Sequence, residues 1–323
     1  ELAATLWPPL FERGVFIHFA HRTFKWSNDA KGKAAVHCVV VGMTMQKPDT
    51  CLIFEYSQEN SEPERRRAKN INCYLVDSTT AALQARRKPL CAVPEMVNGS
   101  KPADGGHLLL TQEERDELIE LEPGATPWVR QFSMGEEFIN AIPRYCLWIQ
   151  DAPAQALAAL PRIQDRLNSV RKMRLKSVDA TTRKLAEFPG RFGADRQPTA
   201  DYLAIPRVSS QTRRYVPMGF LPKSHIAGDQ VQVIPSADPF HFGILTSQMH
   251  MAWVAAVAGR LKSDYRYSAA IVYNNFPWPQ EVREDSRQKI VERAKDVLHA
   301  RQASGLKSLA EMYAMPMLDA GLV

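Results

Sequence analysis

The sequence is 323 residues long, with 45% hydrophobic and 24% charged residues and a formal net charge of +6. This balance is typical of a globular protein of two or three domains and excludes an intrinsically disordered chain. The sequence predicts no signal peptide and contains no run of ~18 apolar residues. The five widely spaced cysteines include no Cys-x-x-Cys pair and argue against a disulfide framework or a zinc site. We therefore expect a cytoplasmic protein with reduced thiols and no membrane partner.

Two apolar runs near the start of the sequence, at residues 14–20 and 34–42, predict buried strands. The segment between them contains Phe24 and Trp26 and predicts an aromatic, polar loop, whose rings either cover the sheet edge or belong to a site. Two strands cannot bury both faces of a sheet alone, so we expect them to be the last strands of a larger α/β sheet. The sequence starts at Glu1 inside a predicted helix, which indicates a fragment of a longer protein.

The next hundred residues predict short strands mixed with helices. We expect strands at 50–56, 71–77, 138–140 and 144–149, and a charged loop at 57–69. Thr111 and Glu114 have capping-box spacing and predict the start of a helix that ends near Glu122. The Asp-Gly-Gly sequence at 104–106 lacks the glycine spacing of a phosphate-binding loop and is interpreted as a tight turn.

The positive charge of the protein is concentrated between residues 162 and 214, with 13 Lys/Arg against 5 Asp/Glu. A helix that follows Asp151 is expected to place its basic residues on one face and Ile163, Leu167, Val170 and Met173 on the other. Such a helix is suited to a phosphate backbone, because each cation neutralises a phosphate and releases a counterion. A solvated helix followed by a basic loop remains the alternative.

A hexapeptide between two strand-like segments differs in chemistry from this basic helix. Residues 209–214 combine hydroxyl, amide and guanidinium groups, which are the side chains that form hydrogen bonds with base edges. A polar hairpin turn is the alternative interpretation.

The remaining sequence predicts a helical region, with one helix over 240–259 and an amphipathic helix over 283–303. The Asn-Phe-Pro-Trp sequence at 275–278 superficially resembles the Asn-Pro-Pro-Tyr/Phe motif of adenine-N6 methyltransferases, but its prolines are misplaced. We do not interpret it as a catalytic site, and no histidine or cysteine spacing predicts a metal site.

Taken together, several motifs resemble the MmeI-like family of DNA adenine-N6 methyltransferases from restriction–modification systems. They are HRTFKWSN at 21–28, AVHCVVVG at 35–42, DGGHLL at 104–109, IPRVSS at 205–210, YVP at 215–217, HFGILTS at 241–247, GRLKSDYRYS at 259–268 and YNNFPWP at 273–279. The resemblance covers essentially the whole chain, with the motifs in the order of the family.

This resemblance implies an α+β chain in three parts. Residues 1–45 would be the last strands of a class I α/β methyltransferase domain, residues 46–235 a target recognition domain with a mixed or antiparallel sheet, and residues 236–323 a helical C-terminal region. The S-adenosylmethionine loop, the catalytic motif and any nuclease would lie upstream in the parent protein. We therefore expect a monomeric, catalytically inert fragment without its own cofactor, whose partners are double-stranded DNA and the N-terminal methyltransferase domain.

The resemblance also implies roles for individual residues. Direct base readout is expected from Ser209, Ser210, Gln211, Thr212, Arg213 and Arg214. Contacts with the DNA backbone are expected from Arg171, Lys172, Arg174, Lys176, Arg183, Lys184 and Arg207. Stacking on an extruded adenine is expected from Phe24 or Trp26. The alternative function is a basic module that binds an acidic protein or RNA. A preference for duplex DNA distinguishes DNA recognition from this alternative.

Overall fold

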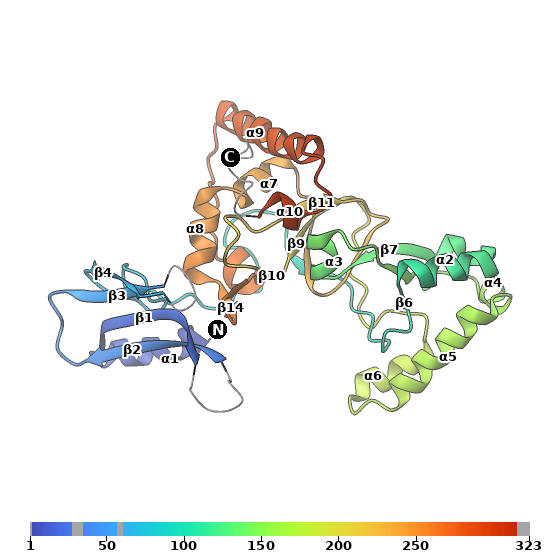
Figure 1. Cartoon of the computed structure of the whole chain (residues 1–323), viewed down its shortest axis with the longest axis horizontal. Coiled ribbons are helices and arrows are strands. Elements are labelled where there is room, and N and C mark those ends of the chain that lie inside the picture. Colours follow the sequence, from blue (N-terminus) through green and yellow to red (C-terminus); the bar gives the residue numbers. More distant parts are fainter. Residues whose placement is uncertain (1, 28–34, 57–60, 315–323) are drawn as a thin grey trace. The chain divides into compact units, whose positions relative to one another are not determined.

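The computed structural model describes residues 2–27, 35–56 and 61–314, and Figure 1 shows its helices and strands. Contacts along the chain divide it into two units, each assembled from separate segments. The first unit contains residues 1–92, 208–212 and 248–280, and the second contains residues 93–207, 213–247 and 281–323. Each unit has its own sheets and its own buried cluster of apolar residues.

The first unit is built around a four-stranded sheet with the order β2-β1-β3-β4. Its strands are β1 (Phe16–Ser27), β2 (Ala35–Thr44), β3 (Cys51–Glu55) and β4 (Glu64–Ala68). β1 pairs antiparallel with β2 and parallel with β3. A register shift between Ile17 and Phe19 interrupts the alternation of side chains along β1, so that Ile17 and Ala20 join Ile53 in one buried cluster. Trp7 and Phe11 of α1 (Leu2–Glu12) pack against this cluster.

The rest of the first unit contains a small second sheet and helical segments. Its elements are β10 (Val208–Ser209), α8 (Gln248–Val257), β14 (Gly259–Leu261), β15 (Asp264–Arg266) and a π-helical turn η3 (Ala269–Tyr273). The Asn275 side chain, within the Asn-Phe-Pro-Trp sequence, donates hydrogen bonds to the carbonyl oxygens of Gln84 and Ala270 at 3.1 and 3.0 Å. Asn275 therefore links this turn to the segment that contains Gln84.

The second unit contains two four-stranded sheets, ordered β11-β9-β13-β5 and β12-β7-β8-β6. The strands are β5 (Val97–Asn98), β6 (Leu109–Leu110), β7 (Val129–Ser133), β8 (Tyr145–Leu147), β9 (Tyr202–Pro206), β11 (Gly219–Leu221), β12 (Ile226–Ala227) and β13 (Val231–Pro235). The longer helices are α2 (Gln112–Leu121), α5 (Pro161–Leu175), α7 (Pro239–Leu245) and α9 (Glu284–Ala303). The shorter helical segments are η1 (Pro123–Trp128), α3 (Gly135–Asn140), α4 (Ala154–Ala158), α6 (Ala180–Lys184), η2 (Leu185–Glu187) and α10 (Leu309–Met312).

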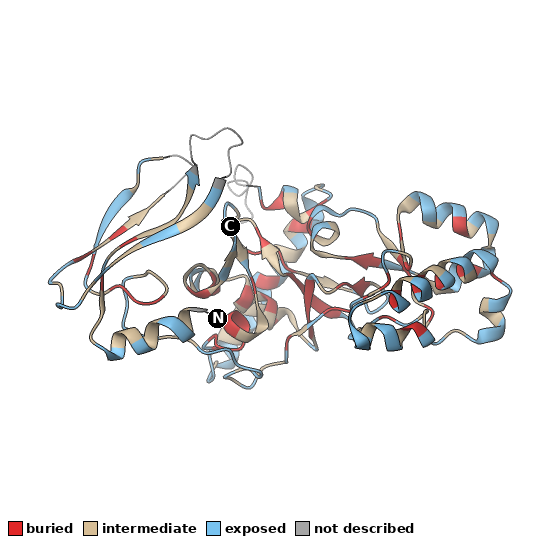
Figure 2. Ribbon diagram, turned by 90° about the horizontal axis from the view of Figure 1, so that it is seen from below, coloured by how far each residue is buried: buried red, intermediate tan, exposed pale blue. Residues whose placement is uncertain are grey.

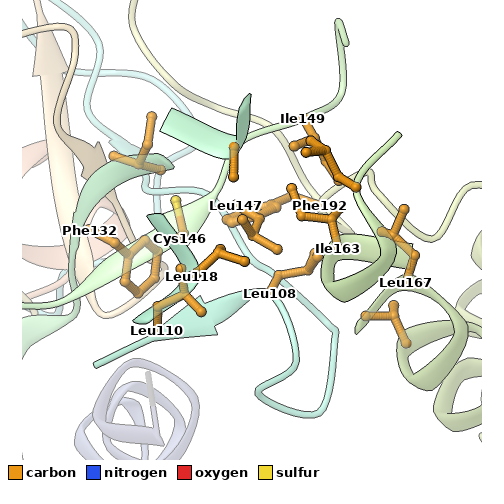
Figure 3. Packing of buried hydrophobic residues seen from close by; sticks show 14 residues of the cluster. Leu108, Leu110, Leu118, Phe132, Cys146, Leu147, Ile149, Ile163, Leu167 and Phe192 are labelled. Carbon is orange, nitrogen blue, oxygen red and sulfur yellow. The ribbon is translucent and has the colours of Figure 1, made fainter. Parts of the chain in front are cut away.

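One apolar cluster joins α5 to the sheet β12-β7-β8-β6 in the second unit. Ile163 and Val170 of the helix are fully buried, as are Leu108, Leu110 and Leu147 from the sheet region. Figure 3 shows Ile163 of the helix together with Leu108, Leu110 and Leu147, with Phe192 beside them. In Figure 2 the helices are buried on one side and exposed on the other, as expected for helices that cover a core.

Small sheets combined with helices, and a mainly helical C-terminal region, confirm the predicted α+β class. The strand at 50–56 is confirmed as β3, the strand at 144–149 as β8, and the helix at 283–303 as α9. The capping box is also confirmed: Thr111 Oγ1 accepts from Glu114 N at 3.2 Å, and Glu114 Oε2 accepts from Thr111 N at 2.9 Å.

Other predicted elements are wrong. The loop after the first strand is part of β1 as far as Ser27, and residues 28–34 lie outside the described residues. Residues 64–68 form a strand within the expected charged loop, residues 71–77 form only an isolated bridge, and residues 138–140 end helix α3. The predicted basic helix is divided into α4 and α5 before Pro161, and the helix at 240–259 is divided into α7 and α8.

Burial of His225 predicts a pH dependence of stability in the second unit. Its Nε2 lies 2.8 Å from Ser133 Oγ, and burial lowers the pKa of the imidazole to about 4. Between about pH 6.5 and 4 the histidine of the unfolded chain, with a pKa of about 6.5, is protonated, whereas the buried His225 stays neutral. Proton binding therefore stabilises the unfolded state, and the free energy of unfolding should fall as the pH drops from about 6.5 to 4.

Urea unfolding at pH 7 and pH 5 measures this effect. His225→Gln, which cannot titrate, should lose less stability between the two pH values than the wild type. Equal losses in the two proteins would contradict the assignment to His225.

Candidate nucleic-acid interface

Helix α5 has the two faces that its sequence predicts. Ile163, Leu167 and Val170 are buried, and Met173 is half-buried beside them. At its first two turns the cations are paired: Arg162 Nη1 lies 3.1 Å from Glu117 Oε1, and Arg166 Nη2 lies 2.8 Å from Glu114 Oε1. The positive charge that remains for a partner is therefore at the C-terminal end of α5.

Three predicted backbone-contact residues are exposed at this end, namely Arg171, Lys172 and Lys176. The Arg171 Nε donates to the Ala186 carbonyl oxygen at 3.2 Å, which leaves its terminal nitrogens on the surface side. Since the last turn of a helix carries partial negative charge, these cations also stabilise α5.

Arg174 was expected to contact the DNA backbone, and the structure corrects this. The residue is 0% exposed, and its guanidinium donates hydrogen bonds to five backbone carbonyl oxygens. The acceptors are those of Pro102, Ala103, Leu185, Phe188 and Arg191, at 2.6–3.1 Å. Burial lowers the pKa of Arg174, but every one of the guanidinium nitrogens donates to a carbonyl oxygen. Arg174 is a structural residue, because its guanidinium is buried and each of its nitrogens already donates to a carbonyl oxygen instead of to a phosphate.

The turn between α5 and α6 is exposed and is held by local hydrogen bonds. The Asp179 carboxylate caps α6 by accepting from the amides of Thr181 and Thr182 at 3.2 and 2.9 Å. Arg183 Nη1 donates to the carbonyl oxygens of Ser177 and Val178 at 2.8 and 2.9 Å. Arg183 and Lys184 are exposed, in agreement with a position on a binding surface.

The structure separates the members of the hexapeptide at 209–214. Ser209 lies in β10, which pairs with β15, and is 2% exposed, so its hydroxyl is not presented to a base. This corrects the expectation for Ser209. Ser210 Oγ lies 2.9 Å from Thr212 Oγ1, and Gln211 N donates to Asp264 Oδ1 at 3.3 Å. The Gln211 and Thr212 side chains are exposed beyond this anchored backbone.

The two arginines that follow belong to the second unit. Arg214 is exposed, and its guanidinium carbon lies 5.6 Å from the Tyr215 ring centroid. Arg213 is half-buried. Arg207, also half-buried, donates to the Asp229 carbonyl oxygen at 3.2 Å.

Phe24 and Trp26 lie in strand β1 and not in a loop. The Phe24 ring stacks on Tyr56 with centroids 5.0 Å apart, and the neighbouring His21 stacks on Phe54 at 4.2 Å. Trp26, whose ring centroid is 6.2 Å from that of Phe24, is 56% exposed. The first unit thus presents a continuous aromatic row on one face of its sheet, with its most exposed ring at the end of β1.

Sequence reasoning missed two sets of cations. Arg65, Arg66 and Arg67 are exposed on the edge strand β4, where a loop was expected, and their consecutive positions were the available signal. Lys101 and Arg191 are exposed in the second unit. Arg191 lies within the basic stretch 162–214 but was assigned no contact, and Lys101 lies outside that stretch. No group of three or more metal-ligating side chains occurs within residues 2–27, 35–56 and 61–314. In the same ranges, no helix combines the length and apolar character needed to cross a bilayer.

Comparisons with known proteins agree with these features. Residues 77–280 match the family model for the target recognition domain of MmeI, and residues 1–55 match the model for the MmeI DNA-methyltransferase domain. DNA methyltransferase A of Bacillus subtilis (strain 168) is 38% identical over 313 residues, which are 97% of this chain and 35% of that protein. The structure of the Type IIL restriction-modification enzyme MmeI in complex with DNA is 42% identical, with a TM-score of 0.93, over 98% of this chain and 42% of that one.

The chain therefore spans well under half the length of these relatives. The target-recognition match alone covers more than half of the 323 residues, and the methyltransferase match precedes it in the sequence. This chain belongs to the MmeI family, of which it contains the target recognition domain and part of the DNA-methyltransferase domain.

Proposed function

We propose that this chain is the sequence-specific recognition module, for double-stranded DNA, of an S-adenosylmethionine-dependent DNA adenine-N6 methyltransferase in a restriction–modification system. The match of residues 77–280 to the MmeI target recognition domain carries this proposal. The similar enzyme was solved with DNA, and the exposed cations of α5 and α6 give this chain the charge that a phosphate backbone requires. The module acts in the cytoplasm, as a monomer within its parent chain.

Specificity is assigned to the hexapeptide without Ser209, which is buried. Ser210, Gln211, Thr212, Arg213 and Arg214 read base edges, since amides and guanidiniums form paired hydrogen bonds with adenine and guanine. The remaining predicted residues contact the phosphate backbone of the DNA and so position the duplex. They are Arg171, Lys172, Lys176, Arg183, Lys184 and Arg207. Phe24 or Trp26 stacks on the extruded adenine in the complete enzyme, for which the aromatic row of β1 provides the surface.

The chemistry of methyl transfer is assigned to the parent protein and not to this chain. S-adenosylmethionine would be the methyl donor there, and the N-terminal methyltransferase domain is the intramolecular partner. We propose the division into residues 1–45, 46–235 and 236–323, with DNA recognition in the middle segment.

Selection of bound duplexes from a randomised DNA pool at low salt, followed by a salt series, tests the function. Enrichment of one short motif with a steep loss of affinity as salt rises is the expected result. Salt-sensitive binding without enrichment would contradict base readout. Preference for single-stranded or A-form RNA would replace the proposal with an RNA-binding function.

Arg213→Ala should weaken binding to the selected duplex by about 1–3 kcal/mol and relax one position of the enriched motif. The reason is that a bidentate guanidinium contact discriminates one base, and alanine accepts all four. The measurement is fluorescence anisotropy with the selected duplex and with single-base variants of it.

Lys172→Ala is the matched comparison, because it removes one positive charge from a predicted phosphate contact. It should weaken binding to all duplexes alike. If Lys172→Ala weakens only the selected duplex, or Arg213→Ala weakens all duplexes equally, the two roles are wrongly assigned.

A further inference from the structure

A tight turn at residues 188–191 follows η2 in the second unit. The Phe188 carbonyl oxygen accepts from Arg191 N at 3.0 Å, and Pro189 fixes the backbone at the second position of the turn. Gly190 faces the core, where a Cβ would lie 3.1 Å from the Ile149 side chain. The inner side of the turn is thus packed on the core, so its outer residues are presented to solvent.

The backbone of this turn is also held from inside the protein. Arg174, which is fully buried, donates to the carbonyl oxygen of Phe188 at 2.9 Å and to that of Arg191 at 2.6 Å. Both ends of the turn are therefore fixed by one guanidinium. A fixed backbone lowers the entropy that is lost when the outer side chains bind a partner.

The outer side of the turn combines an apolar ring and a cation. Phe188 is 49% exposed, and the guanidinium carbon of Arg191 lies 4.8 Å from its ring centroid. Arg191 is exposed, and none of the ion pairs within the described part of the chain involves it. A guanidinium that contacts a ring with its face keeps its nitrogens available to an acceptor.

Other cations border this turn. Lys101 N donates to the Ala194 carbonyl oxygen at 2.9 Å, and the reverse bond is 3.1 Å, so the exposed Lys101 lies on the strand-like segment beside residues 191–194. Arg196 is also exposed, and the nearby carboxylates are those of Glu187 and Asp195. The three cations Arg191, Lys101 and Arg196 against these two carboxylates leave a local charge of +1, which fits a polyanion.

We propose that Phe188 and Arg191 form a contact tip for duplex DNA, in which Arg191 donates to a phosphate oxygen and the Phe188 ring packs on the adjoining deoxyribose. This inference rests on the proposed function and adds to it a contact outside both the hexapeptide and the exposed cations of α5 and α6. Because phosphate and sugar are the same at every base pair, the tip anchors the module and carries no sequence preference.

Binding of the 323-residue chain to its selected duplex and to a scrambled duplex tests the tip, over a salt series. Arg191→Ala should weaken binding to both duplexes about tenfold and reduce the salt slope by about 1, as expected when one charge-assisted phosphate contact is lost. Phe188→Ala should weaken both by about threefold without changing the salt slope, since it removes only apolar contact.

Arg162→Ala is the matched control, because it also removes an exposed arginine of the second unit, but one that is paired with Glu117. It should change the affinity by less than about twofold. An Arg191→Ala affinity within twofold of the wild type, or a loss confined to the selected duplex, overturns the tip and leaves the proposed function standing. A wild-type chain that binds no duplex overturns both.

Discussion

Arg174→Met should lower the free energy of unfolding of the second unit by about 4 kcal/mol, because several buried carbonyl oxygens lose their donor at once. Five acceptors from two segments of the chain, residues 102–103 and 185–191, converge on this guanidinium. Methionine fills a similar volume but has no hydrogen-bond donor, so the expected loss of stability comes from lost hydrogen bonds and not from lost packing. Such a loss is a large part of the total stability of a typical domain, about 5–15 kcal/mol.

The measurement is urea unfolding followed by tryptophan fluorescence, since Trp148 packs against Phe192 in the core of the second unit. Lys172→Met on the same helix is the control, because Lys172 is exposed, and it should change stability by less than about 0.5 kcal/mol. Arg174→Lys should fall between the two, since an ammonium has three donors and a shorter reach. A loss below about 1 kcal/mol for Arg174→Met would show that water replaces the guanidinium at these carbonyls.

Gly99→Ala should destabilise the second unit by about 3 kcal/mol, because the new methyl group collides with backbone and not with a movable side chain. A Cβ at Gly99 would lie 2.3 Å from the Gly228 carbonyl oxygen and 2.5 Å from that of Ala227. The two segments are joined there by hydrogen bonds from Gly99 N to Val231 O and from Ser100 N to Ala227 O, at 2.8 and 2.7 Å. The alanine therefore forces these strands apart.

Gly135→Ala serves as the control substitution. Its Cβ would meet its nearest neighbour, the Gln230 carbonyl oxygen, at 3.4 Å, and it lies at the start of α3, where alanine favours the helix. We expect Gly135→Ala to be neutral or stabilising in the same unfolding assay. Equal stability of Gly99→Ala and Gly135→Ala would mean that the contact of residue 99 with residues 227–228 is not tight in solution.

The elements that the sequence predicts correctly are those whose signals are local. The capping box at Thr111 and Glu114, the apolar periodicity of α5 and the length of α9 depend on neighbours within a few residues along the chain. Residues 138–140 show the limit: Phe138 and Ile139 favour a strand, but they follow a helix start whose acidic residues, Glu136 and Glu137, lie in the first turn.

Contacts between residues that are distant in the sequence determine the features that the sequence does not predict. Arg174 has the spacing of an exposed helical cation, and only the folded chain reveals that residues 102–103 and 185–191 surround it. Ser209 is buried by pairing with β15, more than fifty residues later, which no property of the hexapeptide indicates. The site was thus predictable as a region of charge and polarity, whereas the exposure of each member depends on tertiary contacts.

The interleaving of the two units has a consequence for how the protein is made. The small sheet β10-β15-β14 of the first unit is built from residues 208–212 and 248–280, so a ribosome must synthesise most of the chain before that unit is complete. Its contacts join residues that are distant in sequence, which slows their formation. β2 and β4 are the edge strands of the four-stranded sheet, whose strands all lie within residues 16–68 and are synthesised first, so aggregation of truncated products should begin at these edges. To exchange DNA specificity between two relatives, one should therefore transfer only short surface segments. All the segments that build the sheets and cores of the two units should come from one parent.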